Sequence, residues 1–255
     1  PHMPPVLDDA LCIRHWDWSE TSQTVSLFTR NHGLVRALAK GSKRPKAPFS
    51  GGVELLTRGE AAFIIRPSSE LALLTAWDLE ETYPALRTDL AAHNAGLYVA
   101  DLLHHAITDH DPHPALFDRV AAILRFIGGG PDAHGLALAM LRFQWSVLVE
   151  TGYAPVVEAD AATGEPLPAA PTYYFSPILG GVLAGPSHRD AAAWPVRAET
   201  IHLLQALAAG ADLAAAPPAT VTIDRANRLL AAYLRHVLGR EPPTLPLLFG
   251  RDLPV

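Results

Sequence analysis

The chain has 255 residues, 49% of them hydrophobic and 18% charged, and this composition excludes an intrinsically disordered protein because it supplies enough apolar surface for a core. No apolar run approaches the roughly 20 residues that cross a bilayer and no secretion signal is recognisable, so we expect a globular cytoplasmic protein without a membrane partner. The net charge of −6 argues against a uniformly basic surface that binds nucleic acid.

Residues 10 to 77 have the pattern of a small all-β barrel. Short apolar runs are separated by turn residues such as Gly33, Gly41 and Gly59, and none of the runs has helical spacing. The runs cover 10–16, 23–29, 33–40, 53–58, 61–66 and 70–77. Five or six strands in fewer than 70 residues suit a closed barrel, so we predict an N-terminal barrel domain over 8–80.

After Trp77 apolar residues recur at helical intervals. Helices are predicted over 78–106, 113–127 and 132–151, and they form the first part of a helical domain over 81–152. Pro84 lies near the predicted start of the first helix, and Gly152 is expected to be the left-handed stop of the third.

The last hundred residues begin with an irregular module. Residues 153–195 contain seven prolines and little periodicity. Helical spacing returns over 198–210 and in a last helix from about Thr222 to Leu238, which gives a second helical part over 196–245. The whole pattern predicts an α+β protein.

Positive charge is concentrated in one stretch. Between Phe28 and Arg66 eight basic residues stand against two acidic ones, a local balance of +6 that leaves −12 for the rest of the chain. The eight are Arg30, Arg36, Lys40, Lys43, Arg44, Lys46, Arg58 and Arg66, and they include every lysine of the chain.

Strand alternation aims part of this charge in one direction. In a strand over 33–40, Arg36 and Lys40 point to one face, and the strand leads directly into a loop that carries Lys43, Arg44 and Lys46. A groove that tracks a phosphate backbone needs such an arrangement. The alternative is a solvated loop without a partner. Because the lysines are confined to one loop of an acidic chain, we favour nucleic-acid binding.

Specific motifs add a resemblance to a known family. The stretch LFTRNHGLVRALAKGSKRPKAPFSGG resembles the signature of the bacterial DNA repair protein RecO family, and the likeness continues through AAHNAGLYVADLLHHA, TGYAP and YYFSPILGGVL. It covers most of residues 10 to 240. The resemblance implies an N-terminal OB-fold, a helical domain and a small insert that is a zinc finger in many members.

The resemblance also implies a function. Such a protein is a nucleoid-associated recombination mediator rather than an enzyme, with neither catalytic residues nor a cofactor. It binds single- and double-stranded DNA, anneals complementary strands and helps the recombinase RecA to replace single-stranded DNA-binding protein. RecR and single-stranded DNA-binding protein are the implied partners.

One departure from the family concerns zinc. Members with zinc carry two Cys-x-x-Cys pairs, which would fall near Asp160 and Thr163 and near Ala184 and Ser187, and no cysteine stands at any of these positions. Asp160, Ser187 and His188 are a poor replacement for the four N or S ligands of structural zinc. We therefore expect a metal-free insert that is held together by hydrophobic contacts of Tyr173, Tyr174, Phe175 and Leu179.

A histidine-rich segment supports an alternative function, that of a metal-dependent hydrolase. It contains His104, His105, His110 and His113, interleaved with Asp101, Asp109 and Asp111. These are metal-ligand residue types, and Asp101 would share a helix face with His104 or His105. No second cluster supplies a general base, so a polar helix end is the favoured interpretation. A protein-interaction module that does not bind DNA is the other alternative.

The remaining candidates are aromatic residues, three arginines and the single cysteine. Phe28 is expected in the core, whereas Trp16, Trp18 and Phe49 either pack there or stack on unpaired bases. In the last helix Arg225, Arg228 and Arg235 fall within one arc of about 80°, and they either extend the DNA path or are simply solvated. Cys12 is expected to be a buried structural thiol.

Overall fold

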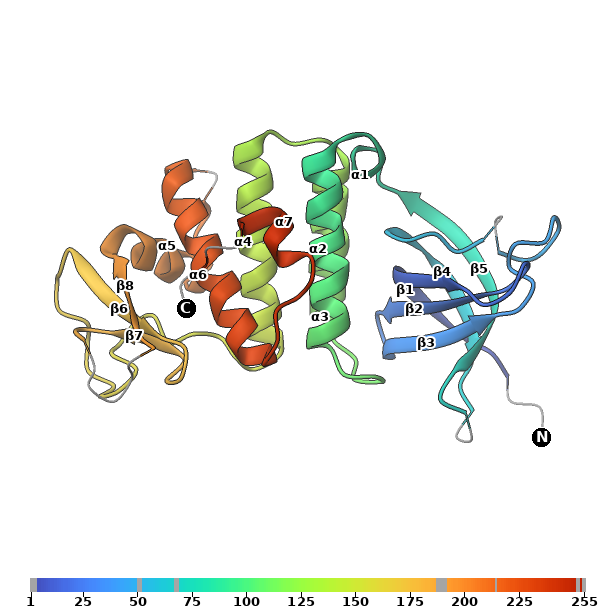
Figure 1. The fold of residues 1–255 in the computed structure, drawn as a ribbon, viewed down its shortest axis with the longest axis horizontal. Coiled ribbons are helices and arrows are strands. Elements are labelled where there is room, and N and C mark those ends of the chain that lie inside the picture. The colour runs from blue at the N-terminus through green and yellow to red at the C-terminus, as the bar shows by residue number, and fades with distance from the viewer. Residues whose placement is uncertain are drawn as a thin grey trace. The chain divides into compact units, whose positions relative to one another are not determined.

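The first five strands close into a barrel, drawn in blue to teal in Figure 1. The computed structural model describes residues 4–49, 52–66, 69–186, 192–213, 215–250 and 253. The barrel strands are β1 (Val6–Asp17), β2 (Gln23–Thr29), β3 (Gly33–Ala39), β4 (Thr57–Ile64) and β5 (Ala72–Thr82). Their order is β1-β2-β3-β5-β4, with a parallel β3–β5 pair and four antiparallel pairs. This is the predicted OB-fold.

The inward side chains of the strands form the barrel core. Val35, Ala37 and Ala39 of β3 are buried while Arg36 is exposed, as the alternation predicted. Phe28 and Cys12 are fully buried, which confirms both predictions. Burial raises the pKa of the Cys12 thiol to about 12, so this sulfur is not a reactive thiolate.

The predicted strand over 53–58 is wrong for its first four residues. Val53 is buried in the core and Leu56 is buried as well, which explains the apolar run, but neither belongs to a strand. Leu56 adopts a φ of 56°, and its amide donates to the carbonyl of Cys12. A left-handed residue interrupts strand pairing, so β4 begins only at Thr57.

The helix predicted over 78–106 begins later and is divided. Residues 78–82 continue β5, because Glu81 and Thr82 still pair with Arg58 and Thr57 of β4. A short helix α1 (Ala85–Thr88) follows, and Asp89 then caps α2 (Leu90–Ala106) by accepting a 2.7 Å hydrogen bond from the amide of Ala92. Helix α3 (Pro114–Gly128) packs against α2.

The chain forms two compact units, Pro1–Pro131 and Asp132–Val255. The predicted helical segment 81–152 is therefore divided between them. The second unit contains α4 (Ala133–Glu150), β6 (Thr172–Ser176), β7 (Gly181–Leu183), β8 (Trp194–Arg197), α5 (Ala198–Ala208), α6 (Thr220–Leu238) and α7 (Leu245–Phe249). Helix α4 packs on α6, where the buried Gln144 amide donates to the Asn227 side chain at 2.8 Å. Gly152 is left-handed, as predicted.

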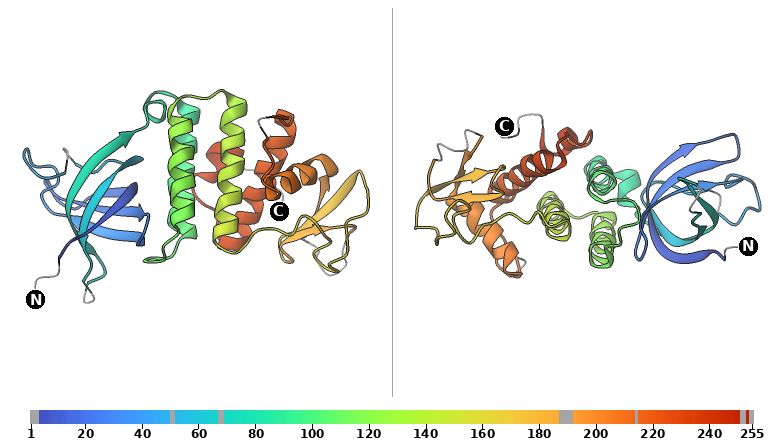
Figure 2. Two further views of the ribbon diagram at one scale, coloured as in Figure 1. Left: turned by 180° about the vertical axis from the view of Figure 1, so that it is seen from behind. Right: turned by 90° about the horizontal axis from the view of Figure 1, so that it is seen from below.

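The insert is more regular than its prolines suggested. Strands β7, β6 and β8 form an antiparallel sheet in that order, and Figure 2 shows β8 running directly into α5. Tyr173 and Phe175 of β6 are buried and Tyr174 is half-buried, whereas Leu179 is 41% exposed in the turn after β6 and is therefore less enclosed than the other three residues expected to hold the insert together. Within the described part of the chain, no helix has both the length and the apolar character of a membrane span.

Candidate nucleic-acid interface

Four of the eight clustered basic residues form ion pairs. Arg30 pairs with Asp118 at 2.8 Å, Arg36 with Asp109 at 3.1 Å and Lys43 with Asp17 at 2.5 Å. Arg58 contacts three carboxylates, those of Asp9, Glu80 and Glu81. The charge of these four residues is thus partly or wholly neutralised by the protein itself.

The other four, Lys40, Arg44, Lys46 and Arg66, are exposed. No acidic side chain of the described residues forms an ion pair with any of them. We call these four the unpaired cations. Because no carboxylate must be displaced first, they are the ones best able to meet a phosphate.

The loop over 40–49 is fixed at both ends. Ser42 is buried and donates to the Gln23 side chain at 3.0 Å, and the same amide accepts from the backbone of Val53 at 3.1 Å. At the other end Phe49 is only 3% exposed and packs in the barrel core, so it is not a base-stacking residue. Arg44 and Lys46 are therefore presented between two anchored points.

Two exposed tryptophans lie in the hairpin that contacts this loop. The Lys43 amide donates to the Thr21 carbonyl at 3.1 Å, which joins the loop to the β1–β2 turn. In that hairpin Trp16 is 48% exposed and Trp18 is 65% exposed. Aromatic and cationic side chains are thus gathered at one end of the barrel, which is the combination that single-stranded nucleic acid requires.

A hollow of about 470 Å³ continues this surface. Lys40 and Arg66 line it, together with Leu38 and residues 69–73. It lies where β3 and β5 pair over three residues, Ala37 to Ala39 with Ala72 to Leu74. Lys40 is the first residue of the 40–49 loop, so the hollow and the loop are adjacent.

The histidine-rich segment is divided among separate ion pairs. Asp101 accepts from Arg14 at 2.6 Å and lies 3.3 Å from His105, Asp109 pairs with Arg36, and Asp111 lies 3.3 Å from His113. No three His, Cys, Asp or Glu side chains of the described residues are grouped to hold a metal ion. Burial, and then the nearby charge of Arg14, lowers the pKa of His104 to about 4.

A carboxylate joins the two segments in which the resemblance would place cysteine pairs. Asp160 accepts from the amides of Ala162 at 2.8 Å and Thr163 at 3.1 Å, and its other oxygen accepts from Ala184 at 2.8 Å. Burial would raise the pKa of Asp160, but these amide hydrogen bonds outweigh it and the pKa is lowered. Ser187 and His188 lie outside the described residues.

The three arginines of α6 have different surroundings. Arg235 lies 3.3 Å from Glu241, whereas Arg225 and Arg228 line a cavity in the second unit. Trp194 and Arg197 line the same cavity, and sequence analysis missed both because they come from β8, far from α6 in the chain.

Comparisons with known proteins decide the family. A family model described as "Recombination protein O N terminal" matches residues 3–83, and one described as "Recombination protein O C terminal" matches residues 87–246. The chain belongs to the RecO family. The N-terminal RecO match ends just after β5 and therefore coincides with the barrel.

Individual RecO relatives agree with the family match. The chain is 31% identical over 250 residues to "DNA repair protein RecO" of Rhodopirellula baltica, covering 96% of this chain and 89% of the relative. It is 30% identical over 234 residues to the protein of the same name from Anaeromyxobacter sp. (strain K), covering 90% of each. The match to that of Pelotomaculum thermopropionicum is 31% over 247 residues, covering 91% and 89%. RecO proteins act in DNA repair, which implies an interaction with DNA.

Proposed function

We propose that the protein binds DNA through the four unpaired cations and the neighbouring hairpin of the barrel. The observation that carries the proposal is the exposure of Lys40, Arg44, Lys46 and Arg66 without carboxylate partners among the described residues. The ion-paired cations Arg30, Arg36, Lys43 and Arg58 contribute less, because a phosphate has to displace a carboxylate from each of them.

The barrel end suits both forms of DNA. Contacts of Lys and Arg with phosphates are independent of sequence and release condensed counterions, so they serve single and double strands alike. Trp16 and Trp18 add stacking that only unpaired bases can use. Because Ser42 and Phe49 already fix the loop, little conformational freedom is lost when DNA binds.

For the wider role, the proposal is based on membership of the RecO family. We propose a recombination mediator that anneals complementary strands and helps RecA to load on DNA coated by single-stranded DNA-binding protein, with RecR and that protein as its partners. Holding strands requires geometry and charge alone, so the proposal needs neither a catalytic residue nor a cofactor. Both family matches, to the barrel and to the helical part, support it.

Fluorescence anisotropy with a single-stranded oligonucleotide across a salt series tests the proposal. The wild-type affinity should fall with salt, and Arg44→Glu with Lys46→Glu should lower low-salt affinity about tenfold and reduce the slope by roughly 0.7 per lost contact. The matched control is Arg30→Glu with Arg36→Glu, which makes the same charge change at cations that are already paired.

The control pair should have the smaller effect. Equal losses for the two pairs would show that net charge alone matters and would contradict the assignment to the loop. A wild-type protein without salt-dependent retention would identify a protein-interaction module instead.

A further inference from the structure

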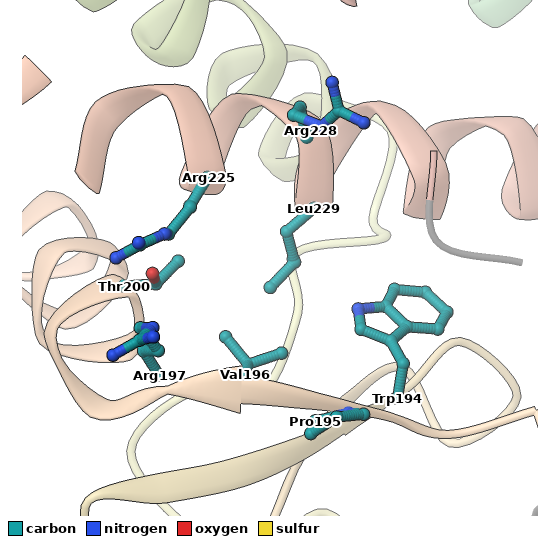
Figure 3. A pocket seen from close by; sticks show the side chains of 8 residues that line it. All are labelled: Trp194, Pro195, Val196, Arg197, Thr200, Arg225, Arg228 and Leu229. Carbon is teal, nitrogen blue, oxygen red and sulfur yellow. The ribbon is translucent and has the colours of Figure 1, made fainter. Parts of the chain in front are cut away.

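A second cationic cavity lies wholly within the second unit. Its volume is about 240 Å³, and its walls come from β8, the start of α5 and the middle of α6 (Figure 3). It shares no residue with the barrel surface described above.

Three arginines line this cavity. Arg197 and Arg225 are exposed, and neither side chain has a hydrogen bond or ion pair with another described residue, although Glu199 and Asp224 are their acidic neighbours in sequence. Arg228 is half-buried and donates to the Phe249 carbonyl at 2.9 Å, which holds it in place. Guanidinium groups match the geometry of phosphate oxygens, so the open ends of Arg197 and Arg225 suit a phosphate.

A buried hydroxyl lies at the same end of the cavity. Thr200 is 1% exposed, and its oxygen has no hydrogen-bond partner among the described residues. Figure 3 shows Thr200 between Arg225 and Arg197. Thr200 also belongs to the first turn of α5, where backbone amides point toward the helix start and favour an anion. A buried polar group without a partner calls for an explanation, and a ligand oxygen supplies one.

The other end of the cavity is apolar and aromatic. Trp194 is half-buried, and its ring lies 5.5 Å from the ring of Phe175, which fixes the indole against the sheet. Val196 and Leu229 are buried and line the wall between Trp194 and the arginines. A free phosphate would leave this half unused, whereas a nucleotide has both a charged part and a flat apolar part.

We propose that this cavity takes one unstacked nucleotide of single-stranded DNA, with its phosphate on Arg197 and Arg225 and its base toward Trp194. The cavity is too small for a run of bases, because its volume lies below the roughly 300 Å³ at which drug-sized ligand pockets begin. The inference rests on the proposed function in that DNA is the source of the nucleotide. It gives the second unit a strand-binding site of its own, so one chain has separate places for two strands.

The test uses the full chain and a fluorescent oligothymidylate in low salt. Arg197→Glu with Arg225→Glu should weaken binding about tenfold and reduce the salt slope by roughly 0.7 per lost contact. The matched control is Arg142→Glu with Arg240→Glu, two exposed arginines of the same unit that line no part of the cavity, and it should change affinity less than about twofold.

A second measurement avoids dependence on folding of the variants. An oligonucleotide that carries 5-iododeoxyuridine should photo-crosslink to Trp194 in the wild-type protein, and mass spectrometry identifies the peptide.

Two variants test the aromatic end of the cavity. Trp194→Phe keeps a flat ring and should retain most of the affinity for the oligonucleotide, whereas Trp194→Ala should lower that affinity about fivefold or more.

The outcomes separate this inference from the proposed function. Weakening by the cavity pair but not by the control pair, with crosslinking to Trp194, supports it. If the loop variants weaken binding while the cavity pair behaves as its control, the proposed function stands and this inference is overturned. It is also overturned if the cavity pair abolishes binding of an acidic peptide and leaves oligonucleotide binding unchanged. If the wild-type protein does not bind DNA at all, both fail together.

Discussion

Arg58 and Arg44 belong to the same barrel and the same basic stretch, yet their surroundings differ completely. Arg58 lies on β4 among carboxylates of β1 and β5, and Glu81 of that group also pairs with Arg125 of α3 at 2.8 Å. Arg44 lies in the anchored loop and has no carboxylate partner among the described residues. In the first region charge joins elements of the fold, whereas in the second it is left for a ligand. A count of basic residues does not distinguish the two.

The largest expected effect comes from the internal network. Arg58→Ala removes the cation that three carboxylates share, so we expect the free energy of unfolding to fall by about 2–3 kcal/mol, discounted for partial exposure. Urea titration measures this. Arg44→Ala is the control and should leave stability within about 0.5 kcal/mol. If the Arg58→Ala protein stays stable but no longer binds DNA, Arg58 is a binding residue and the contrast with Arg44 is wrong.

Asp160 is the corresponding internal charge of the second unit. Asp160→Asn replaces an acceptor of amide hydrogen bonds, and we expect a loss of about 1–2 kcal/mol in unfolding free energy at neutral pH. Because the folded pKa is lowered, the wild-type advantage is fully present above the unfolded value of 3.8 and is lost as pH falls through the folded pKa. The exposed Glu158→Gln is the control. A difference between Asp160→Asn and wild type that persists in strong acid would contradict the role of the ionised carboxylate.

Lys46 lets stability and binding be separated in the loop. Its φ of 111° is unfavourable for a side chain, so Lys46→Gly should raise the free energy of unfolding by up to about 1 kcal/mol while it removes a cation and weakens DNA binding. Lys40→Ala removes a cation without this backbone change and should weaken binding without a gain in stability. Thermal unfolding and anisotropy on the same samples give both quantities. If Lys46→Gly binds DNA more tightly than the wild-type protein does, Lys46 does not belong to the interface.

The smallest effect concerns acid stability near His104. Its folded pKa of about 4 lies below the ordinary 6.5, because burial and Arg14, His105 and Arg36 disfavour the charged ring more than Asp101 favours it. The unfolded state therefore binds the proton first, and stability falls as pH decreases from about 6.5 toward 4. In His104→Gln this decrease should be shallower, whereas the exposed control His202→Gln should follow the wild type. Identical profiles for all three proteins would contradict the burial effect.

Local patterns predicted the elements better than their limits. The apolar runs over 23–29 and 33–40 identified β2 and β3, and the stop of α4 was visible because a left-handed cap favours Gly152. The run at 53–56 gave a false strand, since burial without pairing leaves the same apolar signature. The continuation of β5 through Thr82 depended on its pairing with β4, which no local pattern contains.

The sequence by itself determined the barrel, the order of helices, the basic loop and membership of the family, because period, turn residues and motifs are local properties of the chain. Only the tertiary structure decided which cations are neutralised and which are open, since Arg30, Arg36 and Arg58 meet their carboxylates across sequence separations that no spacing rule covers. The same holds for the cavity of the second unit, where β8, α5 and α6 bring Trp194, Arg197 and Arg225 together. Charge is a property of a residue, but whether that charge is available to a ligand depends on what the fold places beside it.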